Sequence, residues 1–438
     1  MSELVSAIST NMDLSTYKAL TNVKVSRVSI QPENKSDITM TAGNNSDLFI
    51  SFPSRPNSFL DGNNSYLTFT YTMEGTAHGT GRSVAFSNGT PSSLIRTLET
   101  IAGSVSIELI NAYNVISSVV DDFQHKDRAR TLGTILEDKH ASDHKAGFSR
   151  DVATATSAGF TQKRRICIPL MSLAVGSLAD KYFPMGSDIG LRLRLTMEDP
   201  NIAFRTEHDS DADFAVGYKL EDITYEATYL ETDAKTYNQI VKESGGIMKV
   251  SGTGIGNFSH TVPAGGTTNT VLIPARYSSV RSFMTTMRDG DSATKNAYNS
   301  PGGRTRANLT SYVYRIHGAN FPQLSVSCDE YTSSEAFCEV LKSLHSLHNT
   351  SQSCVFPASA YVHSGNNHQG SFVISLDLEE QGFSSSSMSG LDTNSGNTFL
   401  SLEHSSAVPS TGLVIDTFCF YDAIVEINTT TGEVMVSK

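Results

Sequence analysis

The sequence predicts an all-β chain in which one β-rich fold occurs twice. Short apolar runs, many of them alternating with polar residues, recur along its 438 residues. Helical spacing of apolar residues stands out in only two short segments. Landmarks of the first half return in the same order in the second half. Together these observations favour two consecutive β-domains with a few short helices.

Five segments have the length and pattern of strands bounded by Gly, Asn, Asp or Ser turns. In residues 191–197, LRLRLTM, three leucines fall on one face and two arginines on the other. That alternation predicts one buried face and one solvent-facing or interface face. The other four segments are 65–72 (SYLTFTYT), 225–230 (YEATYL), 371–378 (SFVISLDL) and 418–427 (FCFYDAIVEI).

Two segments have the 3–4-residue apolar spacing of a helix face. The second follows Thr332-Ser-Ser-Glu335, a capping-box pattern that satisfies free amides at a helix start. We therefore expect one short helix near 115–123 and another from about 333. The apolar sets are Val115, Ile116, Val119, Val120 and Phe123, and Phe337, Val340, Leu341, Leu344 and Leu347.

The two halves repeat four landmarks in one order. FPSRPNSF at 52–59 and IPARYSSV at 273–280 share an apolar-Pro-small-Arg-x-x-Ser-apolar pattern. Each half then reaches its expected helix, 62 residues after Pro53 and 63 residues after Pro274. Each half closes on a strand with Tyr-acid-Ala, at 225–227 and at 421–423. This order predicts an internal duplication.

The duplication divides the chain into an N-terminal arm at 1–45, a first β-domain at 46–241 and a second at 242–438. The linker is expected near 242–246, KESGG. Acidic and basic residues nearly balance in the arm, so it does not have the basic composition of a genome-binding arm.

Composition excludes several classes of protein. The net charge is -12, which disfavours general nucleic-acid coating because such binding neutralises phosphates. Charged residues make up 18%, against roughly 25% in an ordinary soluble domain. No apolar stretch reaches the length of a membrane span, and the first 20 residues do not look like a signal peptide. The five cysteines lack CxxC spacing, which indicates buried free thiols rather than a disulfide framework or a zinc site.

Two acidic or histidine-rich motifs resemble metal sites only in part. His140 and His144 would share a helix face, but Ala141, Ser142 and Gly147 favour a loop and no third ligand is evident. Asp209, Asp211 and Asp213 resemble the start of a calcium loop. That loop needs Gly and Glu where this chain has Phe214 and Leu220. The expected structures are a polar loop and an acidic turn.

No catalytic constellation is evident. Gly252, Gly254 and Gly256 precede a strand-like segment rather than the helix that a dinucleotide fingerprint requires. There is no GxSxG elbow. The remaining candidates, which lack partner spacing, are His345 and His348 at a helix end, Asp121 and Asp122, Glu99, and Glu108. We therefore expect a protein that is not an enzyme, with no catalytic, cofactor-binding or metal-binding residues and no cofactor.

Residues 124–165 form a basic segment, with nine Lys/Arg and five Asp/Glu, a net charge of +4. Such a segment could pair with an acidic neighbouring subunit, or face a genome or membrane. It has few aromatic residues, so base stacking is not indicated. A solvated loop is the simplest interpretation.

Several of these segments are similar to one viral family. The sequence resembles the double jelly-roll major capsid proteins of double-stranded DNA viruses, especially polinton-like viruses and virophages, with adenovirus hexons as relatives. The resemblance covers roughly residues 48–436 and consists of strand-and-turn patterns. They are FPSRPNSFLD (52–61), GSVSIELINAYN (103–114), IPLMS (168–172), KYFPMGSDIGLRLRL (181–195), LEDITYEATYLE (220–231) and IPARYSSVRSF (273–283).

The resemblance implies two consecutive eight-stranded jelly-roll β-barrels and a structural role. Three copies would form a homotrimeric capsomer of pseudo-hexagonal outline, and the capsomers would tile an icosahedral shell. Implied partners are the chain itself, penton and minor capsid proteins, and an inner membrane, without sequence-specific nucleic-acid binding. The implied location is the virion capsid, assembled inside the host cell.

Two other classes fit the strand pattern. A two-domain β-sandwich carbohydrate-binding or adhesin module would explain the strands and polar loops. It fits less well with the duplication and with the absence of Trp, a common sugar-stacking residue. A β-rich hydrolase would need a nucleophile and a base that the motifs do not supply.

Overall fold

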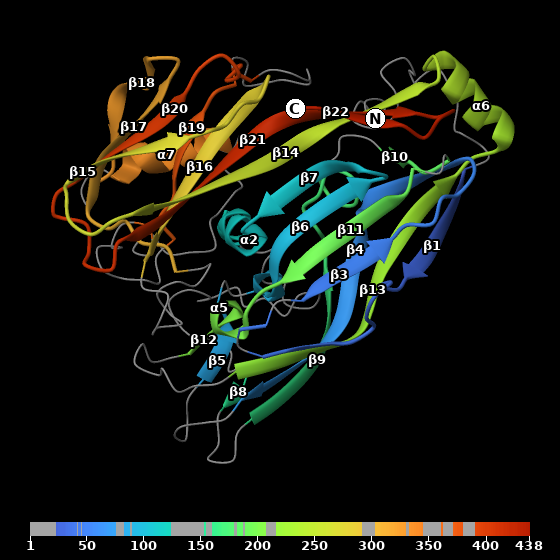
Figure 1. Cartoon of the computed structure of the whole chain (residues 1–438), viewed down its shortest axis with the longest axis horizontal. Coiled ribbons are helices and arrows are strands. Elements are labelled where there is room, and N and C mark those ends of the chain that lie inside the picture. The colour runs from blue at the N-terminus through green and yellow to red at the C-terminus, as the bar shows by residue number, and fades with distance from the viewer. Residues whose placement is uncertain are drawn as a thin grey trace.

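The computed structural model describes most of the chain. The described residues are 23–41, 43–44, 46–75, 83–87, 90–123, 153–154, 160–178, 182–186, 189–206, 216–290, 303–329, 333–344, 361, 371–379 and 390–438. Two β-barrels lie side by side, the first built from the N-terminal half and the second from the C-terminal half (Figure 1).

The second barrel consists of two antiparallel sheets that face each other. Taken in chain order, its eight strands pair as first-eighth-third-sixth in one sheet and second-seventh-fourth-fifth in the other. This order is a jelly roll, in which two Greek keys wrap around one core. The strands are β14 (Ile247–Val262), β15 (Thr268–Ile273), β16 (Val280–Asp289), β17 (Leu309–Ile316), β18 (Ala319–Ser327), β19 (Ile374–Asp377), β20 (Thr398–His404) and β21 (Leu413–Asn428), with β22 (Val434–Ser437) paired to β21.

The first barrel has the same strand order. One sheet runs β1-β13-β4-β10 and the other β3-β11-β6-β7, which again is first-eighth-third-sixth and second-seventh-fourth-fifth. The predicted all-β double jelly roll is therefore confirmed. The strands are β1 (Lys24–Ile30), β3 (Asp47–Ser51), β4 (Ser58–Gly75), β6 (Ile95–Ala102), β7 (Val105–Asn111), β10 (Phe183–Pro184), β11 (Leu191–Met197) and β13 (Val216–Glu231).

Five further described strands belong to the first half of the chain in addition to the eight of the jelly-roll pattern. β9 (Phe160–Ile168) and β10 both pair with β4, along different parts of it. Two separate strands therefore share the sixth position of this barrel. β2 (Ile38–Met40) continues the line of β1 along β13. A small separate sheet contains β12 (Phe204–Thr206), β5 (Ser83–Phe86) and β8 (Ala153–Thr154).

The first barrel begins earlier than residue 46. β1 and β2 both lie within residues 1–45, which the sequence pattern places in an arm, yet both pair with β13. β1 occupies the position that β14 occupies in the second barrel. Residues 24–40 thus contribute sheet structure to the first barrel.

The repeated landmarks occupy equivalent positions. FPSRPNSF links β3 to β4, and IPARYSSV links β15 to β16, so both connect the second and third strands of a barrel. Both Tyr-acid-Ala motifs lie on the eighth strands, β13 and β21. A helix follows the fifth strand in each barrel, α2 (Tyr113–Asp122) after β7 and α7 (Ser333–Ser343) after β18.

Both predicted helices are confirmed, although Leu347 and Thr332 of those predictions lie outside the described residues. Glu335 accepts a hydrogen bond from the Ser327 backbone N–H at 3.0 Å, so it ties α7 to the end of β18. The other helical segments are α5 (Pro200–Ala203), α6 (Ala234–Glu243) and the 3₁₀ turn η1 (Pro91–Leu94). α6 connects the two barrels and overlaps only the first two residues of the predicted 242–246 linker, and Asp233 caps it by accepting from the Thr236 N–H at 2.6 Å.

The alternation of apolar and polar residues along the strands places the apolar ones in the core, as the sequence predicts. Leu191, Leu193 and Leu195 on β11 are buried, while Arg192 is exposed and Arg194 is half-buried. Burying one leucine side chain contributes roughly 1.5–3 kcal/mol. The other predicted strands are present as well, except that β19 covers only 374–377 of the predicted 371–378.

Candidate interaction surfaces

The carboxylates noted in the sequence serve structural contacts. Glu99 on β6 forms an ion pair with Arg194, with Nη1 and Oε2 3.3 Å apart. Asp121 and Asp122 lie at the end of α2, where Asp122 is buried and forms an ion pair with Arg304 of the second barrel. Glu108 on β7 is also buried and accepts several hydrogen bonds.

The three spaced glycines lie on one antiparallel strand. β14 runs unbroken through Gly252, Gly254 and Gly256, so the parallel strand-helix context of a dinucleotide site is absent there. A Cβ on Gly254 would lie 2.4 Å from the ring of Tyr421, and one on Gly256 would lie 2.4 Å from the Tyr277 hydroxyl. The two tyrosine rings stack at 3.9 Å between centroids. These two glycines therefore make room for aromatic packing.

Several sequence candidates lie outside the described residues. They are His140, His144, Asp209, Asp211, Asp213, His345, His348, Cys354 and most of the basic segment 124–165. At the end of that segment, Lys163 on β9 forms an ion pair with Glu221 at 2.6 Å. Hydrogen bonds from Lys163 and Lys219 lower the pKa of Glu221 to about 2.

The cysteines in the described part of the chain are free thiols. Cys328 and Cys419 are buried as expected and Cys167 is half-buried, whereas Cys338 is exposed on α7, so the expectation of burial is wrong for Cys338. Within the described ranges, no group of three His, Cys, Asp or Glu side chains could hold a metal ion. No helix in those ranges is long and apolar enough to cross a membrane.

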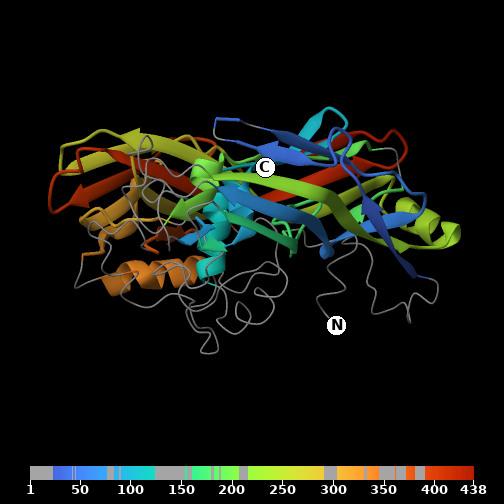
Figure 2. The same ribbon diagram turned by 90° about the horizontal axis from the view of Figure 1, so that it is seen from below.

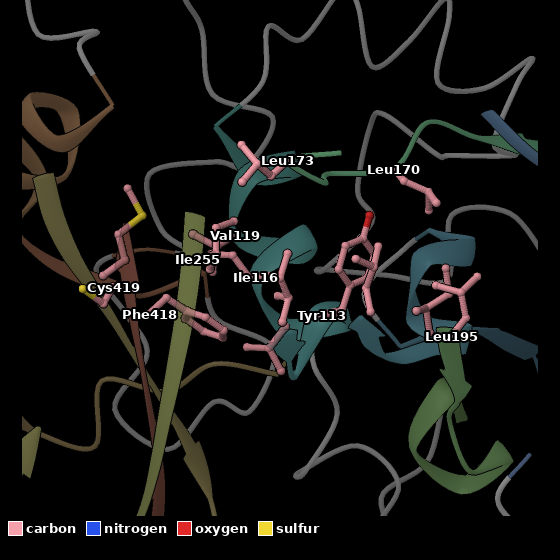
Figure 3. Packing of buried hydrophobic residues seen from close by; sticks show 14 of the residues in the cluster. Tyr113, Ile116, Val119, Leu170, Leu173, Leu195, Ile255, Phe418 and Cys419 are labelled. Carbon is pink, nitrogen blue, oxygen red and sulfur yellow. The ribbon is translucent and has the colours of Figure 1, made fainter. Parts of the chain in front are cut away.

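The seam between the two barrels centres on α2. Ile116 and Val119 of this first-barrel helix face Ile255 on β14 and Phe418 on β21 (Figure 3). All of these side chains belong to one continuous apolar cluster that includes the cores of both barrels. The barrels are therefore joined by buried apolar packing as well as by the chain at α6.

A buried ion pair crosses the same seam. The guanidinium of Arg304 contacts the carboxylate of Asp122, with exposed side-chain fractions of 0% and 1%. Arg304 also donates to the Ser118 hydroxyl on α2 and to the Ser371 carbonyl, each at 3.4 Å. A charge pair this deep fixes the position of α2 relative to the second barrel, because separating the two groups would remove a charged partner from each at a buried site.

The loop at 170–178 contributes a third contact across the seam. The Leu178 carbonyl accepts a hydrogen bond from the Thr253 N–H of β14 at 3.0 Å. The same loop holds Glu108, which accepts from the Leu173 N–H at 2.8 Å and from the Ser172 hydroxyl, while Thr100 donates at 2.7 Å. Burial raises the pKa of Glu108, and these hydrogen bonds oppose the rise.

Replacing Glu108 by glutamine is expected to remove one component of the pH dependence of stability. Because the pKa of Glu108 is higher in the folded state, the folded chain binds its proton more tightly. Glu108 therefore stabilises the fold below its unfolded pKa and loses that contribution as pH rises through its folded pKa. Denaturant unfolding between pH 4 and 8 should show Glu108→Gln gaining stability relative to the wild type as pH rises. A difference that is constant with pH would contradict the assignment.

A polar cleft of about 610 Å³ opens between the barrels. Polar contacts from each barrel line it: Arg288 and Asp416 of the second barrel form an ion pair at 2.6 Å, and the Asn114 amide donates to Glu198 in the first barrel at 2.8 Å. Burial is the largest cause of the raised pKa of Glu198. The cleft is thus lined by polar contacts that each barrel makes within itself.

Among the described residues, the most exposed large apolar side chains lie on strands at sheet edges. Leu324 on β18 is 81% exposed and Val25 on β1 is 63% exposed. Neither residue is singled out by the sequence pattern. Less exposed members of the set are Met435, Leu109, Leu272 and Ile247.

No family model matches the chain, and no curated protein matches it. Solved structures do. The chain is similar to the PBCV-1 virus capsid (TM-score 0.60, 9% identity, 97% of this chain and 98% of that one). It is similar to the Faustovirus major capsid protein (0.58, 9%, 95% and 92%) and to the mavirus major capsid protein (0.53, 10%, 95% and 90%). At these identities the likeness establishes the fold, which spans both barrels.

Proposed function

We propose that this chain is a major capsid protein, a structural, non-enzymatic subunit of an icosahedral virion. Three copies form a homotrimeric capsomer of pseudo-hexagonal outline, and capsomers tile the shell. The observation that carries the proposal is the whole-length likeness of the double barrel to structures titled as capsids or major capsid proteins. Two barrels of one topology supply six similar units from three chains, and closed symmetry then repeats one interface.

The chemistry of the buried polar groups supports a structural role. Asp122, Glu108 and Asp416 are held by Arg304, by hydroxyls and amides, and by Arg288 respectively. The Asp122–Arg304 pair crosses the seam between the barrels, and the other two sets of contacts each lie within one barrel. The proposal takes 46–241 and 242–438 as the barrel domains, with β1 and β2 added to the first.

The proposed partners are other copies of the chain, in the capsomer and between capsomers, together with penton proteins, minor capsid proteins and an inner membrane. The proposed location is the capsid, assembled inside the host cell. Sequence-specific nucleic-acid binding is not part of the proposal, in keeping with the net charge of -12.

The purified chain is expected to be a trimer. Light scattering after size exclusion should give three times the 47.3 kDa of one chain and should hold on dilution. Electron microscopy of concentrated trimers should then show hexagonal outlines and shells or sheets. A monomer at all concentrations would contradict the capsomer and turn attention to glycan binding.

A further inference from the structure

The polar cleft between the barrels has the dimensions of a ligand-binding site. Its volume of about 610 Å³ lies within the roughly 300–1,000 Å³ of pockets that bind small molecules. The first barrel lines it with the start of β6, the end of β7, the start of α2 and the chain at α5, and the second barrel lines it with β14, β16 and β21. α2 and α5 lie close together in the middle of the molecule (Figure 2), so the cleft forms where the two barrels meet.

The charges around the cleft nearly balance. Among the described residues that line it, two arginines and three carboxylates give a formal net charge of -1. Two of the five neutralise each other in the ion pair between Arg288 and Asp416. A cleft with this balance does not attract a phosphate-bearing or otherwise multiply charged ligand. The other three charged residues are Arg96, Glu198 and Asp199.

The two carboxylates of the first barrel are held in place by hydrogen bonds. Glu198 accepts from the Asn114 amide at 2.8 Å. Asp199 accepts from the backbone N–H of Gly43 at 2.5 Å and from that of Asn201 at 2.8 Å. Each carboxylate has about four lone-pair positions, so both keep capacity to accept a hydrogen bond from a ligand.

Other polar groups of the lining have hydrogen-bonding capacity that the protein does not use. Within the described part of the chain, the side chains of Arg96, Asn111 and Ser259 make no hydrogen bond or ion pair. The amide nitrogen of Asn257 is shielded from solvent and also lacks a partner there. The guanidinium and the amide nitrogens are donors, the amide oxygens are acceptors, and the hydroxyl is both. The cleft therefore offers a mixture of donors and acceptors from both barrels.

We propose that this cleft binds a neutral saccharide through hydrogen bonds to its hydroxyl groups. A sugar hydroxyl both donates and accepts, so it matches the mixture of groups that the lining presents. Half-buried Ile202 and Val414 supply apolar surface for the carbon atoms of the sugar ring. The formal charge of -1 favours a neutral sugar over an acidic one. This inference goes beyond the proposed function, because it concerns a ligand site rather than assembly.

Two pairs of variants at surface positions test the site. Ser259→Leu places a branched side chain in the cleft and should weaken sugar binding by about tenfold or more. Its matched control is Thr261→Leu, an equally exposed class of position on the same face of β14 but outside the lining, which should leave affinity unchanged. Arg96→Ala removes an unused donor and should weaken binding by about tenfold, whereas Arg192→Ala, exposed on β11 outside the lining, should have no effect.

Saturation-transfer NMR on the full chain measures binding, and circular dichroism checks that each variant is folded. The probes are glucose, galactose, mannose, N-acetylglucosamine and their short oligosaccharides, with N-acetylneuraminic acid as the acidic comparison. The expected result is binding of at least one neutral probe, weakened by S259L and R96A and retained in both controls. Binding of none of the neutral probes, equal weakening by S259L and T261L, or tighter binding of N-acetylneuraminic acid would overturn the proposal. Light scattering of the same samples reports the trimer separately, so the capsomer and the sugar site can fail independently.

Discussion

Replacing Arg304 with methionine is expected to lower the free energy of unfolding by about 3–5 kcal/mol. The guanidinium is fully buried and contacts Asp122, whose side chain is only 1% exposed. Methionine fills much of the same space but removes the guanidinium partner of the buried Asp122 carboxylate. Because the pair spans α2 and the second barrel, the loss should appear as a lower midpoint of urea unfolding for the whole chain.

Two further variants test whether the loss of stability comes from the burial of the charged pair. Arg194→Met breaks two partly exposed ion pairs, with Asp47 and with Glu99, and since Arg194 is 41% exposed the expected loss is about 1 kcal/mol or less. Combining Arg304→Met with Asp122→Leu removes both buried charges and should recover most of the lost stability. Equal losses of unfolding free energy in Arg304→Met and Arg194→Met would show that the buried pair does not stabilise the seam.

The strands and the duplication could be predicted because their signals are local. LRLRLTM alternates strictly, and a strand with one buried face must do so. FPSRPNSF and IPARYSSV fill the same connection in each barrel, so similar turn geometry keeps similar residues there. The helix after each fifth strand shows its apolar stripe within about three turns of sequence.

The seam could not be predicted, because its partners lie far apart in sequence. Arg304 falls in a stretch that looks like a polar loop, and Asp122 lies 182 positions earlier. β1 could not be predicted as a strand either. Val28 and Ile30 point toward the core, but Val25 is out of phase with them and a polar stretch follows at 31–37.

Replacing Gly176 with alanine is expected to lower the free energy of unfolding by about 3 kcal/mol. A Cβ at this position would lie 2.1 Å from the Leu170 carbonyl oxygen and 2.6 Å from the Ser172 nitrogen. Both are backbone atoms, so no side chain can rotate away to make room. The Gly176 carbonyl oxygen also lies 2.4 Å from where a Cβ of Gly62 would be, so the loop packs closely against β4 at this point.

The same overpacking should reach the second barrel. Leu178, two residues further on, accepts the hydrogen bond from Thr253 of β14, and Ser172 and Leu173 hold Glu108. Gly176→Ala should therefore speed hydrogen exchange at the Thr253 amide as well as lower the unfolding midpoint. Ser177→Ala changes the exposed neighbouring residue and should leave both within error, at about 0.5 kcal/mol or less. If G176A and S177A behaved alike, the close approach of 62 and 176 would not be what fixes the loop against the seam.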